Sequence, residues 1–276
     1  VGARVGAERF LHYFDKLGLT RKTGVDLPGE ASSILHKLEN IKAVELATMS
    51  FGQSFQITPL QLMRAAAAAV NGGTLVTPHF GVSVENAEGV TIKTLEYPLA
   101  ENAVSEETSE QMREMLEAVV SEGTGNKAYL PGFQIGGKTA TSEKLPRRSG
   151  RYIASFLGFA PAENPTVMIL VMIDEPQGIY YGGTIAAPIA AEVFENILPY
   201  LGIVPEYTEE ELANDSVGTV TVPEFTGKTL TEAKALFRAY SEGELYITGE
   251  GENVTEQFPP AGEQVNKNTD LILYVE

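Results

Sequence analysis

Lys138 and its neighbours are the residues whose types and spacing indicate a binding or catalytic site. Gly132, Gly137, Lys138 and Thr139 match the phosphate-loop pattern G-x-x-x-x-G-K-[ST]. The apolar run that ends at Asp174 resembles the acidic strand that would hold magnesium in such a site. On pattern alone the sequence predicts a nucleotide hydrolase. That site needs a helix that begins at the lysine, because the helix N-terminal amides and dipole bind the phosphates.

The residues after this lysine favour a strand instead. Thr139-Ala140-Thr141 continues a strand-like run, and Pro146 with Gly150 leaves no space for a helix. A phosphate loop must also lead through a parallel crossover. Here the next two strand-like runs, 152–160 and 166–174, are joined by a short turn, which makes them antiparallel. The hydrolase hypothesis therefore fits the pattern but not the elements around it.

The elements that must position this strand can be predicted from periodicity and end signals. Gly18 ends the first helix, and Thr58 followed by Pro59 begins the second. The apolar run of residues 167–173 suits a central strand covered by helices on both sides. We expect helices over 1–17, 58–70, 105–120 and 186–201, and strands over 74–84, 90–95, 133–142, 152–160 and 166–174.

Composition excludes several classes of protein. The chain has 276 residues, with 37 acidic against 20 basic side chains and a net charge of −17. Such an acidic chain is not suited to sequence-independent nucleic-acid binding or to docking on an anionic membrane. The absence of cysteine excludes disulfides, thiolate zinc sites and a cysteine nucleophile. No apolar run approaches the roughly 18 residues of a membrane helix.

Charge also divides the chain. Residues 204–217 carry five acids and no base, and residues 218–276 carry ten acids and four bases. An acidic stretch of this kind is typical of a linker. We therefore expect one domain over 1–203, a linker over 204–218 and a second domain over 219–276.

The segment Gly136-Gly137-Lys138-Thr139-Ala140-Thr141 resembles the Lys-Thr-Gly motif of penicillin-binding proteins and serine beta-lactamases, which lies on an edge strand of the active site. Six further segments stand in the order familiar from class B penicillin-binding proteins. They are Leu17-Gly18-Leu19 to Gly29-Glu30, Ser50-Phe51-Gly52-Gln53, Thr58-Pro59-Leu60-Gln61-Leu62, Glu122-Gly123-Thr124-Gly125, Phe156-Leu157-Gly158-Phe159-Ala160-Pro161 and Asp174-Glu175-Pro176.

The second domain resembles a PASTA module, with Val222-Pro223 at its start and an alternating strand over 271–275 at its end. The resemblance implies an α/β (α+β) fold, in which part of a transpeptidase domain, a helical lobe plus an antiparallel sheet, precedes a small α+β domain. Ala140 in place of the usual motif glycine, together with a single PASTA module, is most similar to the sporulation-specific class B proteins of endospore-forming bacteria. The division transpeptidases of Gram-positive bacteria are the nearest alternative.

The family's reaction is acyl transfer on peptidoglycan stem peptides that end in D-Ala-D-Ala, and beta-lactams bind the same site. The resemblance assigns Lys138 to electrostatic support of the substrate carboxylate and of proton transfer. It assigns the Thr139 hydroxyl to a hydrogen bond with that carboxylate, and the Thr141 amide to half of the oxyanion hole. Ala140 and Glu143 are expected to line the substrate, with Glu143 standing where related transpeptidases often have glutamine.

A local count supports an anion site, with a solvated basic loop as the alternative. The count of +4 comes from Lys138, Lys144, Arg147, Arg148 and Arg151 against Glu143. No cofactor or metal is implied. The expected partners are stem peptides, beta-lactams and other proteins of cell-wall synthesis.

The family's nucleophile lies in a Ser-x-x-Lys helix and its proton-relay serine in a Ser-x-Asn loop, and neither pattern occurs in these 276 residues. We therefore expect a longer enzyme, extracytoplasmic and anchored by an N-terminal helix, and in the space between the forespore membranes if the sporulation resemblance holds. The chain alone should be inactive. Two alternatives stay open, a non-catalytic wall-binding or scaffold protein and the nucleotide hydrolase.

Overall fold

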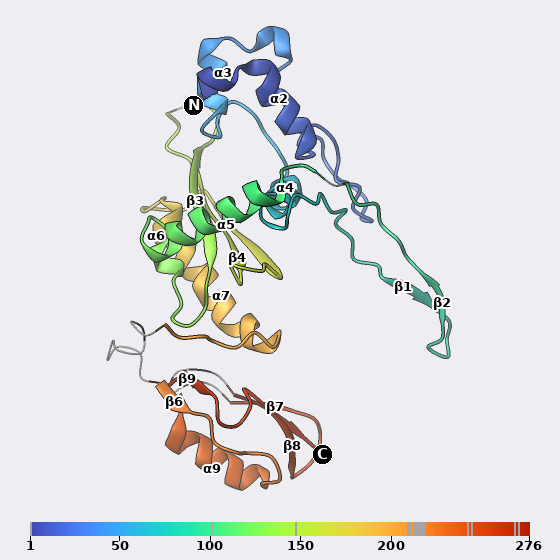
Figure 1. The fold of residues 1–276 in the computed structure, drawn as a ribbon, viewed down its shortest axis with the longest axis vertical. Helices are drawn as coiled ribbons and strands as arrows, with labels where there is room; N and C mark the ends of the chain where they lie inside the picture. The colour runs from blue at the N-terminus through green and yellow to red at the C-terminus, as the bar shows by residue number, and fades with distance from the viewer. Residues whose placement is uncertain are drawn as a thin grey trace.

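The computed structural model describes residues 2–100, 102–146, 148–208, 211, 219–241, 243, 245–267, 269 and 271–276. Figure 1 shows two units, with the N-terminal helices at the end of the molecule opposite to the C-terminus. The first unit contains α1 Gly2–Val5, α2 Ala7–Lys16, the 3₁₀ helix η1 Leu38–Asn40, α3 Ala43–Met49, α4 Pro59–Val70, β1 Ser83–Glu85, β2 Thr91–Thr94, α5 Glu106–Ser121, the 3₁₀ helix η2 Asn126–Ala128, β3 Gly136–Glu143, β4 Tyr152–Ala160, β5 Val167–Asp174, α6 Gly182–Ile185 and α7 Ala187–Tyr200.

A three-stranded antiparallel sheet in the order β3-β4-β5 forms the centre of this unit. In its register Lys138 lies opposite Leu157, which in turn lies opposite Leu170. Strand β3 is therefore an edge strand of the described sheet, as the resemblance implied. The strand continues through Glu143 without a helix, so the structure contradicts the geometry that a phosphate loop needs.

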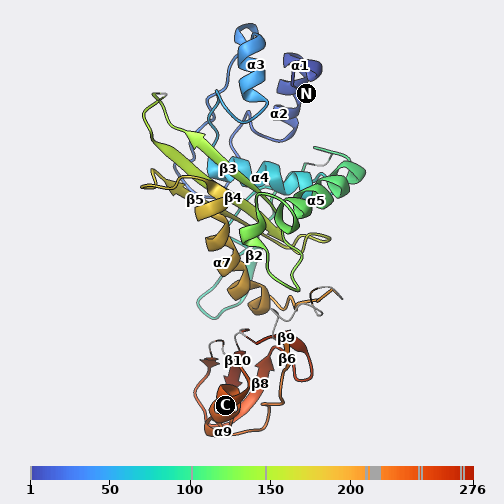
Figure 2. The ribbon, with the colours of Figure 1, turned by 90° about the vertical axis from the view of Figure 1, so that its left-hand side faces the viewer.

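Helices cover both faces of the sheet, as Figure 2 shows. On one face, Phe156 of β4 packs in a cluster with Phe194 of α7. On the other face, Phe159 packs against Val70 of α4 and Leu116 of α5. Because side chains alternate along a strand, the two phenylalanines of β4 anchor opposite layers.

Local sequence explains where α4 and α5 begin. The Thr58 hydroxyl accepts a hydrogen bond from the Gln61 backbone N–H at 3.1 Å, and the Gln61 side chain accepts one from the Thr58 N–H at 2.9 Å. The Ser105 hydroxyl accepts from the Thr108 N–H at 3.1 Å. Such caps pair helix N–H groups that would otherwise lack partners.

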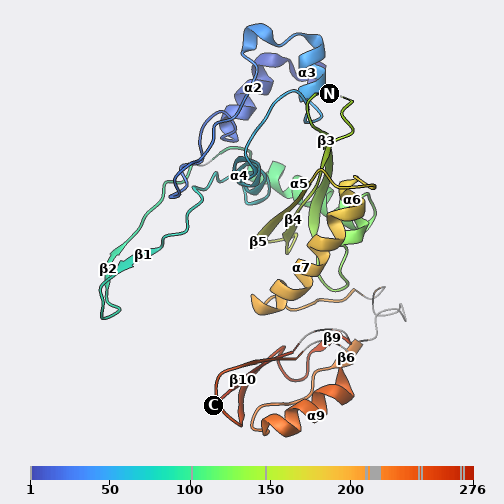
Figure 3. The ribbon, with the colours of Figure 1, turned by 180° about the vertical axis from the view of Figure 1, so that it is seen from behind.

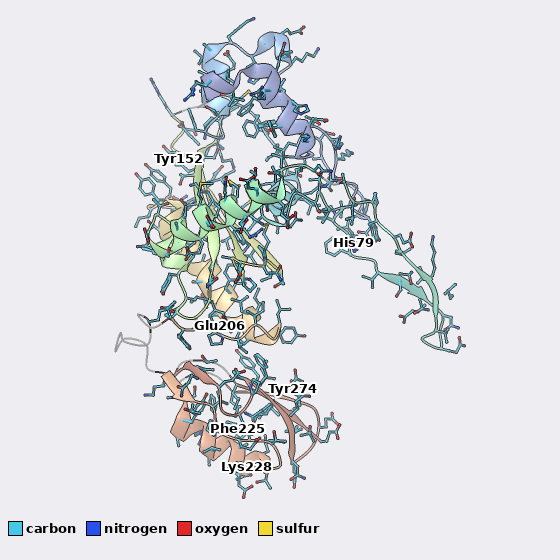
Figure 4. The ribbon with its side chains drawn as sticks, in the orientation of Figure 1. His79, Tyr152, Glu206, Phe225, Lys228 and Tyr274 are labelled. Atoms are coloured by element: carbon cyan, nitrogen blue, oxygen red, sulfur yellow. The ribbon has the colours of Figure 1, made fainter. Side chains whose placement is uncertain are left out.

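The β1–β2 hairpin projects away from the sheet (Figure 3). Its base is held by the Asp26 carboxylate, which accepts hydrogen bonds from the Gly81 N–H at 2.8 Å, the Phe80 N–H at 2.9 Å and the Tyr97 hydroxyl at 3.0 Å. These bonds, the one from Gly81 above all, lower the pKa of Asp26. The Tyr97 ring stacks on His79 with 3.9 Å between centroids, and His79 is labelled in Figure 4.

The second unit contains β6 Thr219–Thr221, α9 Leu230–Tyr240, β7 Leu245–Thr248, β8 Val254–Phe258, β9 Gln264–Asn266 and β10 Leu271–Val275. Strand β10 is central, parallel to β7 and antiparallel to β8. Phe225 and Phe237 belong to the one buried cluster that the described residues of this unit form. The Phe225 N–H donates to the Gln257 side chain at 2.7 Å, which fixes the loop that carries the phenylalanine.

Described residues of the expected linker are hydrogen-bonded to the first unit and line a cavity beside the second. The Glu206 N–H donates to the Gly132 carbonyl at 2.7 Å, and the Glu211 carboxylate accepts from the Tyr129 hydroxyl at 2.5 Å and from the Gly132 N–H at 2.9 Å. A cavity of about 330 Å³ lies between the linker and the second unit and is lined by Val204, Pro205, Tyr207, Glu263 and Gln264. Residues 209, 210 and 212–218 of the expected linker lie outside the described residues.

The predicted fold class is confirmed, while two local expectations need correction. The helix expected over 1–17 is divided between α1 and α2 at Gly6, where φ is 81°, and residue 1 lies outside the described residues. The strands expected over 74–84 and 90–95 form only the short hairpin β1–β2. The apolar run 167–173 forms β5, which contacts both α4 and α7 and is an edge strand of the sheet among the described residues.

Candidate active site

The glycines before Lys138 allow β3 to pack closely on β4. A Cβ atom added to Gly136 would lie 2.2 Å from the Phe159 ring, and one added to Gly137 would lie 2.4 Å from the Phe156 ring. Both positions are buried and in register with β4. The two rings therefore hold the start of the motif strand from opposite faces, and only glycine fits there without displacing them.

The free edge of β3 presents backbone groups of the motif. The Lys144 N–H donates to the Arg151 carbonyl at 2.9 Å, so this pair is hydrogen-bonded. Hydrogen-bonded and non-bonded pairs alternate along an antiparallel ladder. Thr139 and Thr141 fall at non-bonded positions, and their N–H and C=O groups therefore point off the edge. The Lys138 ammonium donates to one of these carbonyls, that of Thr139, at 2.8 Å.

Two other segments contact the threonine side chains of the motif. The Thr139 hydroxyl lies 3.2 Å from the Thr124 hydroxyl. The Thr141 hydroxyl accepts a hydrogen bond from the Gly182 N–H at 3.2 Å. A Cβ atom on Gly182 would lie 2.4 Å from the Ala140 carbonyl oxygen, so α6 begins in direct contact with the motif strand. Sequence reasoning gave no role to Thr124 as a contact of Thr139 or to Gly182.

Ala140 replaces the glycine of the family motif without strain. Its side chain is exposed, and its φ is not in the left-handed region. In the alternation of β3 it lies on the same face as Lys138 and opposite to Thr139 and Thr141. The close approach of Gly182 concerns the backbone of Ala140 rather than its methyl group. The departure from the family pattern is therefore accommodated at the surface.

Glu143 ends the motif strand and contacts the loop that follows. Its carboxylate accepts a hydrogen bond from the Arg148 backbone N–H, and Arg148 has a φ of 66°. Glu143 lies opposite Tyr152 of β4, whose ring stacks on Tyr180 with 4.0 Å between centroids. Tyr152 is labelled in Figure 4. The carboxylate thus fixes the loop between β3 and β4 at the end of the candidate site.

Two basic side chains of this loop, Lys144 and Arg151, pair with acids that lie outside the segment in which the charges were counted. The Lys144 ammonium lies 2.7 Å from a Glu175 oxygen and 2.9 Å from an Asp174 oxygen, and these bonds, first that with Glu175, raise the pKa of Lys144. Arg151 also pairs with Glu175, at 3.3 Å. Lys144 is therefore unable to offset the charge of Glu143 while it holds these partners. Arg147 lies outside the described residues.

The chain belongs to the family of penicillin-binding protein transpeptidase domains. The model of that family, the penicillin binding protein transpeptidase domain, matches residues 1–195, and the model of the PASTA domain matches residues 220–276. In residues 2–276, leaving aside the undescribed positions, no helix has the length and apolar character to cross a bilayer.

Among individual proteins, the chain is similar over its whole length to Stage V sporulation protein D of Bacillus subtilis, with 39% identity over 43% of that protein. It is 36% identical to the probable peptidoglycan D,D-transpeptidase PenA of Neisseria meningitidis, over 74% of this chain and 34% of that protein. The crystal structure of penicillin binding protein 3 from Mycobacterium tuberculosis, complexed with ampicillin, matches with a TM-score of 0.67 and 28% identity over 75% of this chain and 48% of that chain. The chain thus spans less than half the length of each relative.

Proposed function

We propose that this chain is part of a serine-type peptidoglycan D,D-transpeptidase. A serine outside these 276 residues attacks the carbonyl of the penultimate D-Ala of a stem peptide, and the terminal D-Ala leaves as the amine. An amine of a neighbouring stem then attacks the acyl-enzyme, which forms the cross-link and releases the serine. A beta-lactam acylates the same serine by opening of its ring.

The free edge of β3 carries this proposal. The backbone groups of Thr139 and Thr141 point off the edge, so an extended peptide can pair with them as an added strand. The Thr141 N–H supplies half of the oxyanion hole. Lys138 supports the substrate carboxylate and the proton transfer, and the Thr139 hydroxyl hydrogen-bonds that carboxylate. Ala140 and Glu143 border the substrate.

The similarity to Stage V sporulation protein D over the whole chain supports a role in spore cortex synthesis. This role would place the enzyme outside the cytoplasm, in the space between the forespore membranes. Expression of the complete gene in a Bacillus subtilis strain that lacks its own Stage V protein D tests it. We expect the complete gene to restore the formation of heat-resistant spores. Failure to restore them, together with rescue of a strain that lacks its division transpeptidase, would favour the division alternative.

Acylation by a fluorescent penicillin tests the enzymatic function. The complete protein should become covalently labelled, and Lys138→Ala should lower the second-order acylation rate by about 100-fold or more, because such groups stabilise charge that develops in the transition state. Lys228→Ala, in the PASTA module, is the matched control and should leave the rate unchanged. The 276-residue chain should stay unlabelled, because it has no Ser-x-x-Lys nucleophile.

Other outcomes would point to the alternatives. A complete protein that binds purified cell wall but takes no penicillin label would favour a non-catalytic wall-binding protein. A labelled 276-residue chain would contradict the assignment of the nucleophile to another part of the protein.

A further inference from the structure

Thr124 contacts the motif strand from a turn that the proposed reaction does not use. The turn lies between α5 and η2 and is fixed by the Gly125 N–H, which donates to the Val119 carbonyl at 2.9 Å. The hydroxyls of Thr124 and Thr139 are 3.2 Å apart. A Cβ atom on Gly183 would lie 2.5 Å from the Thr124 carbonyl oxygen and 3.2 Å from the Thr139 methyl group. The two threonines are therefore held together by close packing as well as by the hydrogen bond.

The direction of this hydrogen bond follows from what Thr139 is proposed to bind. A hydroxyl has one proton to donate, and an ionised carboxylate only accepts hydrogen bonds. If Thr139 donates its proton to a substrate carboxylate, the bond between the two threonines must be donated by Thr124. Thr141 shows the same arrangement, since its hydroxyl accepts from the Gly182 N–H. With Thr124 as the donor, each motif hydroxyl would accept a bond from the protein and keep its own proton for a ligand.

We propose that Thr124 is a positioning residue that orients the Thr139 hydroxyl for carboxylate recognition. The inference rests on the proposed function, because it assumes that the edge of β3 binds an anionic acyl donor. Without the Thr124 donor, the Thr139 hydroxyl can rotate toward other acceptors, such as water, and the oriented donor is lost before the ligand arrives. The effect should therefore fall on binding of the carboxylate rather than on bond making at the carbonyl.

Acylation kinetics of the complete protein can separate these two effects. Thr124→Val removes the hydroxyl with little change in shape, and Thr124→Ser keeps it. Each variant is compared for benzylpenicillin and for its methyl ester, which lacks the carboxylate charge. For Thr124→Val we expect the dissociation constant of the non-covalent benzylpenicillin complex to rise roughly 3- to 10-fold, the range of one net hydrogen bond. The first-order acylation step should change less than about twofold.

The ester and the serine variant give the decisive comparisons. The ester should react at similar rates with Thr124→Val and with the unchanged protein, and Thr124→Ser should restore benzylpenicillin binding. The ratio of the acylation rates with benzylpenicillin and with its ester, measured on one variant, does not depend on the amount of folded protein. An equal loss for both ligands would show that Thr124 only supports the fold, and no loss for either would also overturn the proposal. If the unchanged protein is not acylated at all, the proposed function fails, and this inference fails with it.

Discussion

Among the described residues, the PASTA module gathers nine buried apolar side chains into one cluster, whereas the larger unit divides its buried side chains among four. Within the larger unit, the cluster around Phe14 joins the N-terminal helices, and the cluster around Phe156 and Phe194 joins the sheet to α7. Figure 1 shows the helices α1–α3 away from the sheet. The small module is therefore built as one cooperative unit, and the larger one as several packed parts.

The difference also concerns what each unit leaves exposed. In the module, the central strand β10 has a partner on each side. In the larger unit, close packing is concentrated behind β3, while the edge and the far end of this strand carry polar groups. A rigid strand whose polar edge has no neighbouring strand among the described residues is suited to binding an extended peptide. We therefore expect substitutions in the buried cores to cause large losses of stability, and substitutions nearer the polar edge of β3 to have smaller effects.

The single core of the module gives the largest expected effect. Residues 219–276 should fold alone, and Phe225→Ala should abolish their cooperative thermal unfolding. Phe225 is 0% exposed, and truncation of a buried phenylalanine costs about 3–5 kcal/mol. That is a large part of the stability of a domain of this size, on the order of 3–9 kcal/mol. Circular dichroism would measure it, with Ile247→Thr, on a partly exposed strand position, as the control. An unchanged melting temperature for Phe225→Ala would show that the module does not depend on one cluster.

The packing behind β3 gives the next effect. Gly137→Ala should destabilise the larger unit by about 1–3 kcal/mol, because the new methyl group overlaps the Phe156 ring. Adding Phe156→Leu should recover part of this loss, with a coupling of about 1 kcal/mol between the two sites. Ser142→Ala on the same strand is the control. Calorimetry of the chain should show that the unfolding transition of the PASTA module does not move. If the losses of stability from Gly137→Ala and Phe156→Leu simply add in the double variant, the Phe156 ring does not limit the approach of β3.

Sequence predicted the elements whose causes are local. Helix α4 follows from Thr58, Pro59 and an apolar repeat, and β4 was predicted over its observed range, 152–160. The edge position of the motif strand followed from the resemblance and not from any local pattern. The helix over 1–17 was predicted as continuous because its apolar face hides the break at Gly6.

The contacts that build the site could not be predicted, because they join distant segments. Thr124 and Thr139 are 15 residues apart, and Gly182 and Thr141 are 41 apart. The partners of Lys144 lie 30 and 31 residues further along the chain. The charge count over residues 138–151 therefore predicted a strongly basic loop, whereas in the structure Lys144 and Arg151 are paired with acids from outside that segment. Glycines at 123, 125, 182 and 183 were the available signal, since they mark close approach of backbones.

The joint between the two units should be weaker than either core. Burial alone would raise the pKa of Glu211, but hydrogen bonds from Tyr129, Thr208 and Gly132 lower it overall. A lowered folded pKa contributes stability that is present above the ordinary value of 4.5 and is lost as the pH falls through the folded pKa. Glu211→Gln and Tyr129→Phe should each weaken linker docking by about 1 kcal/mol, and acid should do the same to the unchanged chain.

Energy transfer between two dyes measures this docking, because the chain has no cysteine and accepts labels at chosen positions. Cysteines at Tyr200 and Lys234 would report the distance between α7 and α9. The unchanged chain should give a narrower distance distribution at neutral pH than either variant. Glu206→Gln is the matched control, since Glu206 joins Gly132 through its backbone. Identical distributions for all four proteins would show that docking of Glu211 on the first unit does not set the distance between α7 and α9.

The polar end of β3 gives the smallest expected effect. Glu143→Gln keeps an acceptor for the Arg148 N–H, so it removes the charge while retaining the loop contact. A like charge about 6–8 Å from a ligand carboxylate costs on the order of 2 kcal/mol at an effective dielectric constant near 20, and exposure reduces this to a few tenths. In the complete protein we expect benzylpenicillin to acylate Glu143→Gln roughly twofold faster at low salt, with a smaller difference at high salt. Glu163→Gln, in the turn between β4 and β5, is the control for net charge. Equal second-order rates at low salt would mean that Glu143 serves the loop alone and that the site ends at Thr141.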